Sequence, residues 1–172
     1  MRILLYGFGP YKQFRENITA KIIKAMPRQP GLRKLVFPVR FDRGQFVGAL
    51  KRHRPDVVIG LGQSTRRRIE IEARASNRRR SNKRHSAKPI FKSRARWLAT
   101  TLALKLARQA HRSKNAGEYV CNYSMYVMLD HIQRNGLGTG FGFLHIPHNY
   151  DPDKAGKLIR TVLRKLMRSA EG

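Results

Sequence analysis

The residues with the clearest capacity for chemistry are one cysteine, one histidine and two glutamates. Cys121 is the only cysteine of the chain, and it follows a turn that contains Asn115 and Gly117. From Tyr119 onward apolar residues recur at helical spacing, which predicts that Cys121 lies in the first turn of a helix. Unpaired backbone N–H groups and the positive end of the helix dipole favour a thiolate there. The position suits a nucleophile, although an isolated cysteine is more often a small buried residue on an apolar helix face.

The histidine and the glutamates lie in two segments with strand-like patterns. Residues 142–147 form a short apolar run, predicted as a buried strand that carries His145 near its end. Residues 68–75 alternate between polar and apolar and contain Glu70 and Glu72, two of only ten acidic residues in the chain. A thiol nucleophile needs an imidazole to share its proton and a group that orients this imidazole. Taken singly, each of these residues is more often structural, but together with the cysteine they would supply all three roles.

Four short motifs connect these residues to a known family. They are Gly7-Phe-Gly-Pro-Tyr11, Ile71-Glu72 followed five residues later by Asn77, Asn115-Ala-Gly-Glu-Tyr-Val-Cys121-Asn-Tyr, and Phe143-Leu-His145-Ile-Pro147. In this order they resemble the N-terminal, glutamate, cysteine and histidine motifs of pyroglutamyl peptidase I, the pyrrolidone-carboxylate peptidase family of cysteine peptidases. The resemblance extends over most of the chain, and the four motifs in order are far more specific than any one alone.

The resemblance implies an activity and a catalytic set. The family removes an N-terminal pyroglutamyl residue from peptides through a thioester intermediate and without a cofactor. Carried over to this sequence, its motifs imply a triad of Cys121, His145 and Glu72. Glu72 is favoured over Glu70 because only Glu72 has the family's spacing to an asparagine.

Four further residues are candidates for the substrate pocket. Phe8 and Tyr11 follow the first predicted strand, at the end of the sheet where ligands bind in α/β folds. The family uses aromatic residues at these two positions against the pyrrolidone ring, although Tyr11 replaces its usual phenylalanine. Gln63 coincides with a glutamine of many family members, and Tyr119 lies in the cysteine motif. Packing against neighbouring elements is the alternative role of the aromatic pair.

The elements that must position these residues are predicted to alternate along the chain. Apolar runs indicate strands at 2–6, 32–39, 56–62 and 142–147, and helical spacing indicates helices at 18–26, 42–53, 94–111 and 153–167. The segment 68–75 is predicted to be an edge or partly exposed strand. Such alternation favours a mainly parallel sheet covered on both faces. The resemblance implies the same α/β class, a three-layer α/β/α sandwich with a mainly parallel or mixed central sheet.

Length and composition limit the class of protein. The 172 residues suit a single domain, 1–172. No apolar run approaches the roughly 18 residues of a membrane span, and one cysteine excludes an internal disulfide, so we expect a cytoplasmic protein without membrane contact. The histidines other than His145 show no metal-ligand spacing, so no metal site is expected.

The most unusual feature of the composition is a formal net charge of +27. Between residues 66 and 96 the chain has thirteen Lys or Arg against two Glu. Residues 78–89 have almost nothing apolar to bury and are predicted to form an exposed, mobile loop. A solvated basic surface is the commoner role of such a segment, and non-specific binding of a polyanion is the alternative. An isolated aromatic such as Phe91 makes no base-stacking platform, which argues against sequence-specific RNA recognition.

Two departures from the family leave alternatives open. The stretch between the glutamate and cysteine motifs is shortened, and Arg79, Arg80 or Arg84 would replace the arginine that the family has there. The connection after the histidine motif, which contributes to subunit association in the family, is also shorter, so both a monomer and a homo-oligomer are open. A polyanion-binding protein with the peptidase fold and a thiol hydrolase of a different small amide are the competing functions.

Overall fold

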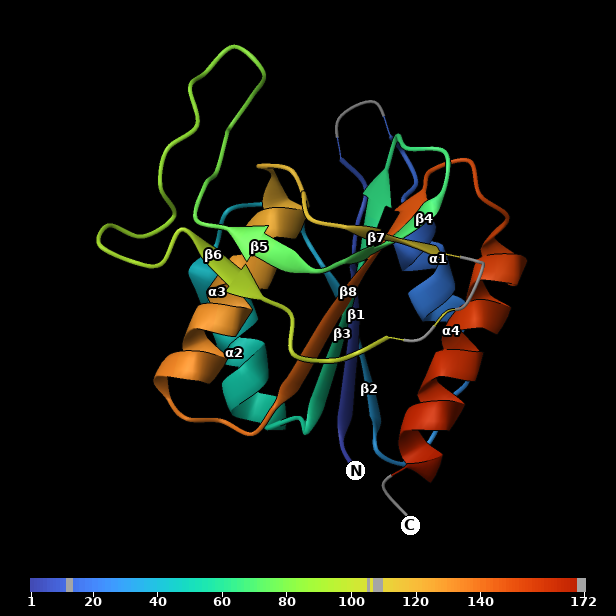
Figure 1. Ribbon diagram of the computed structural model, residues 1–172. Helices are drawn as coiled ribbons and strands as arrows, with labels where there is room; N and C mark the ends of the chain where they lie inside the picture. The colour runs from blue at the N-terminus through green and yellow to red at the C-terminus, as the bar shows by residue number, and fades with distance from the viewer. Residues whose placement is uncertain (12–13, 105, 107–109, 170–172) are drawn as a thin grey trace.

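The computed structural model describes residues 1–11, 14–104, 106 and 110–169 (Figure 1). Within these residues the main sheet has six strands in the order β2-β1-β3-β8-β4-β7. Their bounds are β1 Ile3–Phe8, β2 Leu32–Phe37, β3 Val57–Ser64, β4 Ile69–Glu72, β7 Ala110–Ser113 and β8 Gly140–Pro147. Strands β2, β1, β3 and β8 run parallel to one another, whereas β4 is antiparallel to β8 and parallel to β7. The sheet is therefore mixed, with two strands reversed at one side.

Four helices in the described residues cover the two faces of this sheet. Helices α2 (Arg43–His53) and α3 (Val120–Arg134) lie on one face, and α1 (Ile18–Ala25) and α4 (Pro152–Arg168) lie on the other (Figure 1). Each face has its own apolar cluster, because strand side chains alternate between the two faces. The predicted three-layer α/β/α sandwich with a mixed sheet is confirmed.

Polar side chains cap the starts of three helices. The side chain of Asn17 accepts a hydrogen bond from the N–H of Thr19 at the start of α1. Asp42 caps α2 and Asp151 caps α4 in the same way. These caps satisfy N–H groups that have no partner within the helix. Helices α1 and α4 place their predicted apolar residues against the sheet.

The helix predicted at residues 94–111 is wrong. The described residues of this stretch contain two short strands instead, β6 (Trp97–Ala99) and the start of β7. Between these strands, residues 105 and 107–109 lie outside the described residues. The N–H groups of Thr101 and Leu102 donate to the carbonyl of Phe141, and Leu102 and Leu104 pack at glycines of β8. A side chain at Gly142 would lie 2.9 Å from Leu104. The leucines at every second position are therefore an extended pattern, which the helical interpretation overlooked.

The segment 68–75, predicted as an edge or partly exposed strand, is partly exposed but does not form a single strand. It divides after Glu72 into β4 and β5 (Arg74–Ser76), and β5 pairs with β6 in a separate two-stranded sheet. Strand β4 has β8 on one side and β7 on the other, so it is an interior strand. This position buries Glu72 completely.

Candidate active site

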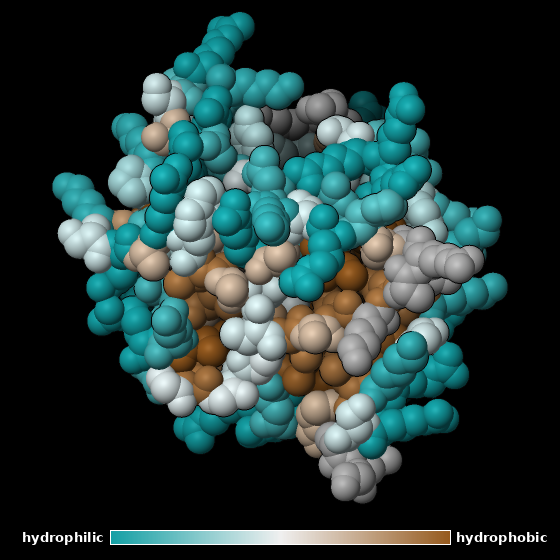
Figure 2. Space-filling view, in the orientation of Figure 1, coloured by the Kyte–Doolittle hydropathy of each residue, from teal (hydrophilic) through white to brown (hydrophobic). Residues whose placement is uncertain are grey.

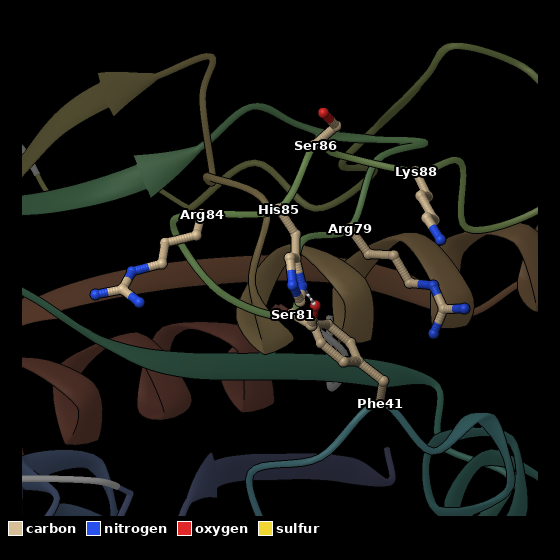
Figure 3. Close-up of a pocket in the computed structure, with 7 residues that line it drawn as sticks. All are labelled: Phe41, Arg79, Ser81, Arg84, His85, Ser86 and Lys88. Atoms are coloured by element: carbon tan, nitrogen blue, oxygen red, sulfur yellow. Dashed lines mark hydrogen bonds between the residues drawn. The ribbon is translucent and has the colours of Figure 1, made fainter.

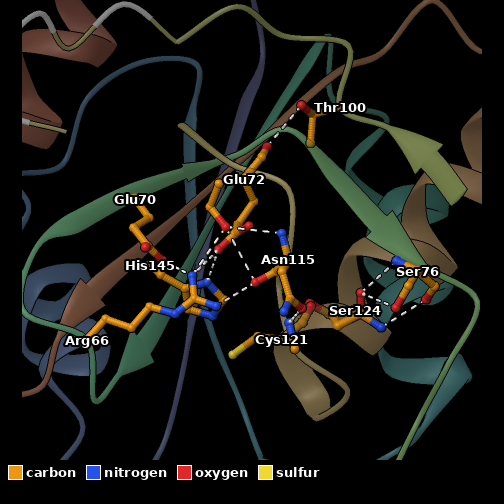
Figure 4. A network of polar contacts seen from close by, with 12 residues as sticks. Arg66, Glu70, Glu72, Ser76, Thr100, Asn115, Cys121, Ser124 and His145 are labelled. Atoms are coloured by element: carbon orange, nitrogen blue, oxygen red, sulfur yellow. Dashed lines mark hydrogen bonds and ion pairs between the residues drawn. The ribbon is translucent and has the colours of Figure 1, made fainter. Parts of the chain in front are cut away.

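The three residues of the implied triad meet at one end of the sheet, although they come from three elements (Figure 4). Cys121 is the second residue of α3, His145 lies near the end of β8, and Glu72 ends β4. In the register of the sheet His145 is paired with Gly62 of β3 on one side and with Glu70 of β4 on the other. Paired residues point to the same face, and Glu72 shares the face of Glu70 because it is two positions further along the strand. The antiparallel β4 thus brings its carboxylate beside the imidazole.

The contact between His145 and Glu72 is short and enclosed. Nδ1 of His145 donates to Oε1 of Glu72 at 2.7 Å, and both side chains are buried. Burial alone would raise the pKa of Glu72, but the hydrogen bond and positive charge of His145, together with Ser113 and Arg66, outweigh it and lower that pKa below its ordinary value. The carboxylate is therefore charged at neutral pH and holds the Nδ1–H form of the ring.

The other ring nitrogen faces the cysteine. Burial would lower the pKa of His145, but hydrogen bonds to Cys121 and Glu72 and the negative charge of both groups raise it to about 9. The imidazole therefore carries its proton at neutral pH and stands between a carboxylate and a sulfur. This is the arrangement in which a cysteine peptidase transfers a proton to its leaving group.

A glycine leaves the space in which the sulfur and the imidazole meet. A Cβ atom at Gly62 would lie 2.8 Å from Sγ of Cys121 and 2.9 Å from Nε2 of His145. Real Cβ atoms do not approach other atoms so closely, so a side chain at this position would displace the sulfur, the ring or both. The sequence alone does not indicate this role of Gly62, which comes from its pairing with His145 across β3 and β8.

A second basic residue, Arg66, supports the carboxylate. Its guanidinium is 3.6 Å from Oε1 of Glu72 and forms an ion pair with Glu70. It also donates to the hydroxyl of Ser113 at 3.2 Å and to the carbonyl of Asn115 at 2.7 Å. Arg66 therefore ties the glutamate strand to the turn that precedes the cysteine helix. Arg66 was not predicted as a site residue. It lies in an arginine run, and its neighbours in the sequence are exposed.

The start of α3 is fixed from the opposite side by Asn122. Its side-chain amide donates to the carbonyls of Ser76 and Arg78 at 2.9 and 2.8 Å, and its oxygen accepts from the N–H of Ser76 at 2.8 Å. The N-cap residue, Tyr119, makes no capping hydrogen bond with its side chain. The side chain of the cap residue therefore does not occupy the N–H groups of the first turn, which contains Cys121.

The two buried pocket candidates have internal contacts. Phe8 ends β1 with an exposed fraction of 2%, and its ring packs edge-on against Tyr6 and Phe46 in the aromatic core. Gln63 is half-buried, and its oxygen accepts a hydrogen bond from the N–H of Ile18 at the start of α1. Both residues lie at the active end of the sheet, and these contacts give each of them a structural role as well.

The two tyrosine candidates lie on the surface. Tyr11 and Tyr119 have exposed fractions of 39% and 40%. Tyr11 follows β1 and Tyr119 precedes α3, so the two flank the same end of the fold as the cysteine. Contact of these four residues with a pyroglutamyl ring stays a prediction.

The arginines considered for the family's arginine divide into two groups. Arg80 forms an ion pair with Glu118 at 2.7 Å, and Arg78 forms a second ion pair with the same carboxylate at 3.1 Å. Arg79 and Arg84 instead line a cavity within the basic segment. Asn77 closes the base of this segment, because its oxygen accepts from the N–H groups of residues 90 and 91 and its nitrogen donates to the carbonyl of residue 91.

Two further observations concern the described residues only. They contain no group of three His, Cys, Asp or Glu side chains placed to hold a metal ion. Among their helices, none has both the length and the apolar character needed to cross a bilayer.

A mixed α/β/α fold that brings a cysteine, a histidine and a glutamate to one end of its sheet has the geometry of a thiol hydrolase. Residues 99–159 match the sequence profile of the pyroglutamyl peptidase family. The pyrrolidone-carboxylate peptidase of Thermococcus onnurineus is 30% identical over 188 residues, which cover 95% of this chain and 94% of that protein. The chain therefore belongs to the pyroglutamyl peptidase, or pyrrolidone-carboxylate peptidase, family of cysteine peptidases.

Other relatives agree in sequence and in fold. The pyrrolidone-carboxylate peptidase of Thermococcus kodakarensis is 28% identical over 171 residues, covering 88% of this chain and 83% of that protein. A mutant pyrrolidone carboxyl peptidase from Pyrococcus furiosus superposes with a TM-score of 0.87, covering 98% of this chain and 99% of that chain, at 22% identity. The fold of that solved structure is therefore retained over nearly the whole of this chain.

Proposed function

We propose that the protein is a cysteine exopeptidase that hydrolyses the amide bond after an N-terminal pyroglutamyl residue, with Cys121, His145 and Glu72 as its catalytic triad. The observation that carries this proposal is the meeting of these three side chains in one enclosed site, with Glu72 hydrogen-bonded to one ring nitrogen at 2.7 Å and the cysteine on the other. Family membership supplies the substrate class.

The first half of the reaction forms a thioester. The thiolate of Cys121 attacks the carbonyl carbon that joins the pyrrolidone ring to the next residue, and the carbonyl oxygen becomes an oxyanion. N–H groups in the first turn of α3 are the donors placed to stabilise it. The imidazolium of His145 then donates its Nε2 proton to the leaving amine, and the C–N bond breaks. The shortened peptide leaves, and the pyroglutamyl group stays on sulfur.

The second half restores the enzyme. Neutral His145 accepts a proton from water through Nε2, and the resulting hydroxide attacks the thioester carbon. The C–S bond breaks, pyroglutamate is released, and the sulfur and the imidazolium regain their starting states. Throughout, Glu72 keeps the ring in one orientation and stabilises its charged form, without itself taking the proton.

Hydrolysis of a chromogenic pyroglutamyl amide by the pure protein tests this function. Release of the chromophore by the wild type and not by Cys121→Ala would support the proposal. Cleavage of other small amides with no cleavage of the pyroglutamyl amide would instead favour the thiol hydrolase of a different substrate. A folded protein with no amidase activity would leave the binding protein as the better interpretation.

The net charge of +27 supports a second proposal, non-specific binding of polyanions. Basic side chains of the segment 78–96 are mostly exposed, and within the described residues only Arg78, Arg80 and Arg94 of this segment form ion pairs with carboxylates. Uncompensated positive charge attracts phosphate backbones without regard to sequence. Self-association of the chain likewise stays a prediction.

A further inference from the structure

A cavity of about 480 Å³ lies within the basic segment (Figure 3). We call it the basic cavity, and its walls are formed by Phe41, Arg79, Ser81, Arg84, His85, Ser86 and Lys88. An antiparallel bridge between Arg79 and Lys88 closes the loop that carries six of these residues. Its walls therefore belong to one loop, completed by a single aromatic side chain from the α2 side of the fold.

The basic cavity is attached directly to the start of the cysteine helix. The side chain of Asn122 donates to the carbonyl of Arg78, and the N–H of Arg80 donates to the carbonyl of Glu118 at 2.7 Å. These two anchor residues lie on either side of Cys121 in the sequence. The ring of Phe41 also packs edge-on against the ring of Tyr123, with centroids 5.2 Å apart. The loop that forms the cavity is thus held by the first turn of α3 and by the residues just before it.

The charge of the basic cavity is not neutralised by the protein. Glu118 pairs with Arg78 and Arg80, which lie outside the cavity lining. In the part of the chain that the structure describes, no ion pair joins Arg79, Arg84 or Lys88 to a carboxylate. All three side chains are exposed, and the guanidinium of Arg79 lies 5.7 Å from the ring centre of Phe41. Figure 3 shows Arg79 and Lys88 on one side of His85 and Arg84 on the other, so positive charge flanks the cavity and attracts small anions.

The remaining wall groups suit a carboxylate on a short aliphatic stem. The hydroxyls of Ser81 and Ser86 and the imidazole of His85 are hydrogen-bonding groups, with Ser81 and His85 in contact at 2.8 Å. The half-buried ring of Phe41 provides one apolar surface. Guanidinium and ammonium groups form their strongest hydrogen bonds with carboxylates. A nucleic acid is less well matched, because the one aromatic ring of the cavity is already packed against Tyr123 and offers no stacking platform.

We propose that the basic cavity binds an acidic side chain of the peptide substrate on the leaving-group side of the scissile bond, so that the enzyme prefers pyroglutamyl peptides with Asp or Glu next to the pyroglutamate. This inference rests on the proposed function, because it assigns a substrate class to the same reaction. The observation that links the cavity to the reaction is the anchoring of its loop at Glu118 and Asn122, which lie on either side of Cys121 in the sequence.

The test compares kcat/KM for three short amides that differ only in the residue after pyroglutamate: Ala, Glu and Lys. At low salt we expect the Glu substrate to exceed the Ala substrate by about 10-fold, because several cations act on one carboxylate. The Lys substrate should be cleaved more slowly than the Ala substrate. The preference should shrink in 0.5 M salt, where charges more than a few ångströms apart are screened.

A triple variant tests the assignment to the cavity. Arg79→Gln, Arg84→Gln and Lys88→Gln together should bring the Glu-to-Ala ratio of kcat/KM close to one. Lys157→Gln, Arg164→Gln and Arg168→Gln remove the same three charge types from exposed positions of α4, on the other side of the sheet, and should leave the ratio nearly unchanged. Arg84→Glu should reverse the order of the Glu and Lys substrates, which loss of packing alone would not do.

Binding separates failure of this inference from failure of the proposed function. With Cys121→Ala, a fluorescent pyroglutamyl-Glu peptide should bind about 10-fold more tightly than its Ala counterpart, and the triple variant should remove that difference. If no pyroglutamyl amide is cleaved, the proposed function fails. The ratio of the two peptide affinities then still shows whether the basic cavity binds an acidic side chain. Equal kcat/KM and equal binding for the Glu and Ala peptides would overturn the inference. It would also be overturned if the triple variant lost only DNA affinity and kept the peptide preference, which would assign the cavity to polyanions.

Discussion

The triad and the basic cavity are both charged regions beside the start of α3, yet their charges are arranged in opposite ways. In the triad His145 and Glu72 are buried and face each other at 2.7 Å. In the basic cavity the cations are exposed, and no ion pair with a carboxylate involves them within the described residues. Buried pairs interact strongly over short distances and resist screening, whereas exposed like charges act on distant ions and weaken in salt.

This difference gives the two regions distinct signatures in an experiment. Changes in the triad should reduce turnover for every substrate by large factors and respond to pH. Changes in the basic cavity should alter the ranking of substrates by modest factors and respond to salt. A variant of one region whose activity changed in the way expected for the other region would contradict this comparison.

The largest effect is expected at the nucleophile. Cys121→Ala should lower kcat by about 10⁴-fold or more, and Cys121→Ser nearly as much, because a serine hydroxyl is a far weaker nucleophile than a thiolate. The measurement is the release of a chromophore from a pyroglutamyl amide, with circular dichroism as the control for folding. Retention of more than a tenth of the wild-type rate in Cys121→Ala would exclude this residue as the nucleophile.

Removal of the carboxylate charge should have the next largest effect. Glu72→Gln should lower kcat/KM by about 10³-fold but leave measurable turnover, because Glu72 orients the ring and does not react. Glu70→Gln is the matched control on the same strand and should change the rate little. Equal losses in the two variants would contradict the assignment of Glu72.

The pH profile gives an independent reading of the same contact. Because His145 must be protonated to donate to the leaving amine and its pKa is raised to about 9, kcat/KM of the wild type should fall as the pH rises through about 9. Since Glu72 contributes to raising this pKa, Glu72→Gln should move the alkaline limb to lower pH. A limb that stayed in place would show that the carboxylate does not act on the imidazole.

A smaller loss is expected where space, not charge, is removed. Gly62→Ala places a methyl group where Sγ of Cys121 and Nε2 of His145 approach, so one of them must move by a substantial fraction of an ångström. Such a displacement of catalytic groups costs about 10²-fold in kcat. Gly48→Ala is the control, since a Cβ there meets no atom within 4 Å. Full activity in Gly62→Ala would contradict the observed closeness of the two side chains.

The smallest effect belongs to the exposed charges. The protein should bind duplex DNA weakly and without sequence preference, and its affinity should fall steeply as salt is added, because each neutralised phosphate releases a counterion. Arg79→Ser with Arg84→Ser should lower the slope of log K against log salt by about two. Fluorescence anisotropy at several salt concentrations measures this slope. Binding that ignored salt would contradict the view that these side chains act as free surface charge.

The sequence predicted the parts of this structure whose signals are local. Helices α1, α2 and α4 begin close to their predicted starts, and the buried strands are continuous apolar runs. The position of Cys121 in the first turn of α3 also follows from local spacing. Family resemblance, not local pattern, supplied the choice of Glu72 over Glu70.

The parts that could not be predicted depend on contacts between distant segments. Leu102 and Leu104 pack at the glycines of β8, and nothing in their own sequence neighbourhood indicates those glycines. Arg66 and Gly62 owe their positions beside the triad to the pairing of β3, β8 and β4. In the sequence, Arg66 lies in an arginine run, which is typical of surface loops. Gly62 lies in a Gly-x-Gly sequence, which is typical of tight turns.

The antiparallel strand that supplies Glu72 has a consequence for the behaviour of the protein on heating. Strand β4 is four residues long, and only β7, equally short, lies beyond it in the described sheet. Cys121 instead belongs to a helix of 15 residues that packs in the core. Short strands at or next to the edge of a sheet open locally at a lower free energy than the whole domain unfolds. Turnover should therefore disappear on warming before the helical signal does, and the working lifetime of the protein would be set by two marginal strands and not by the stability of its core.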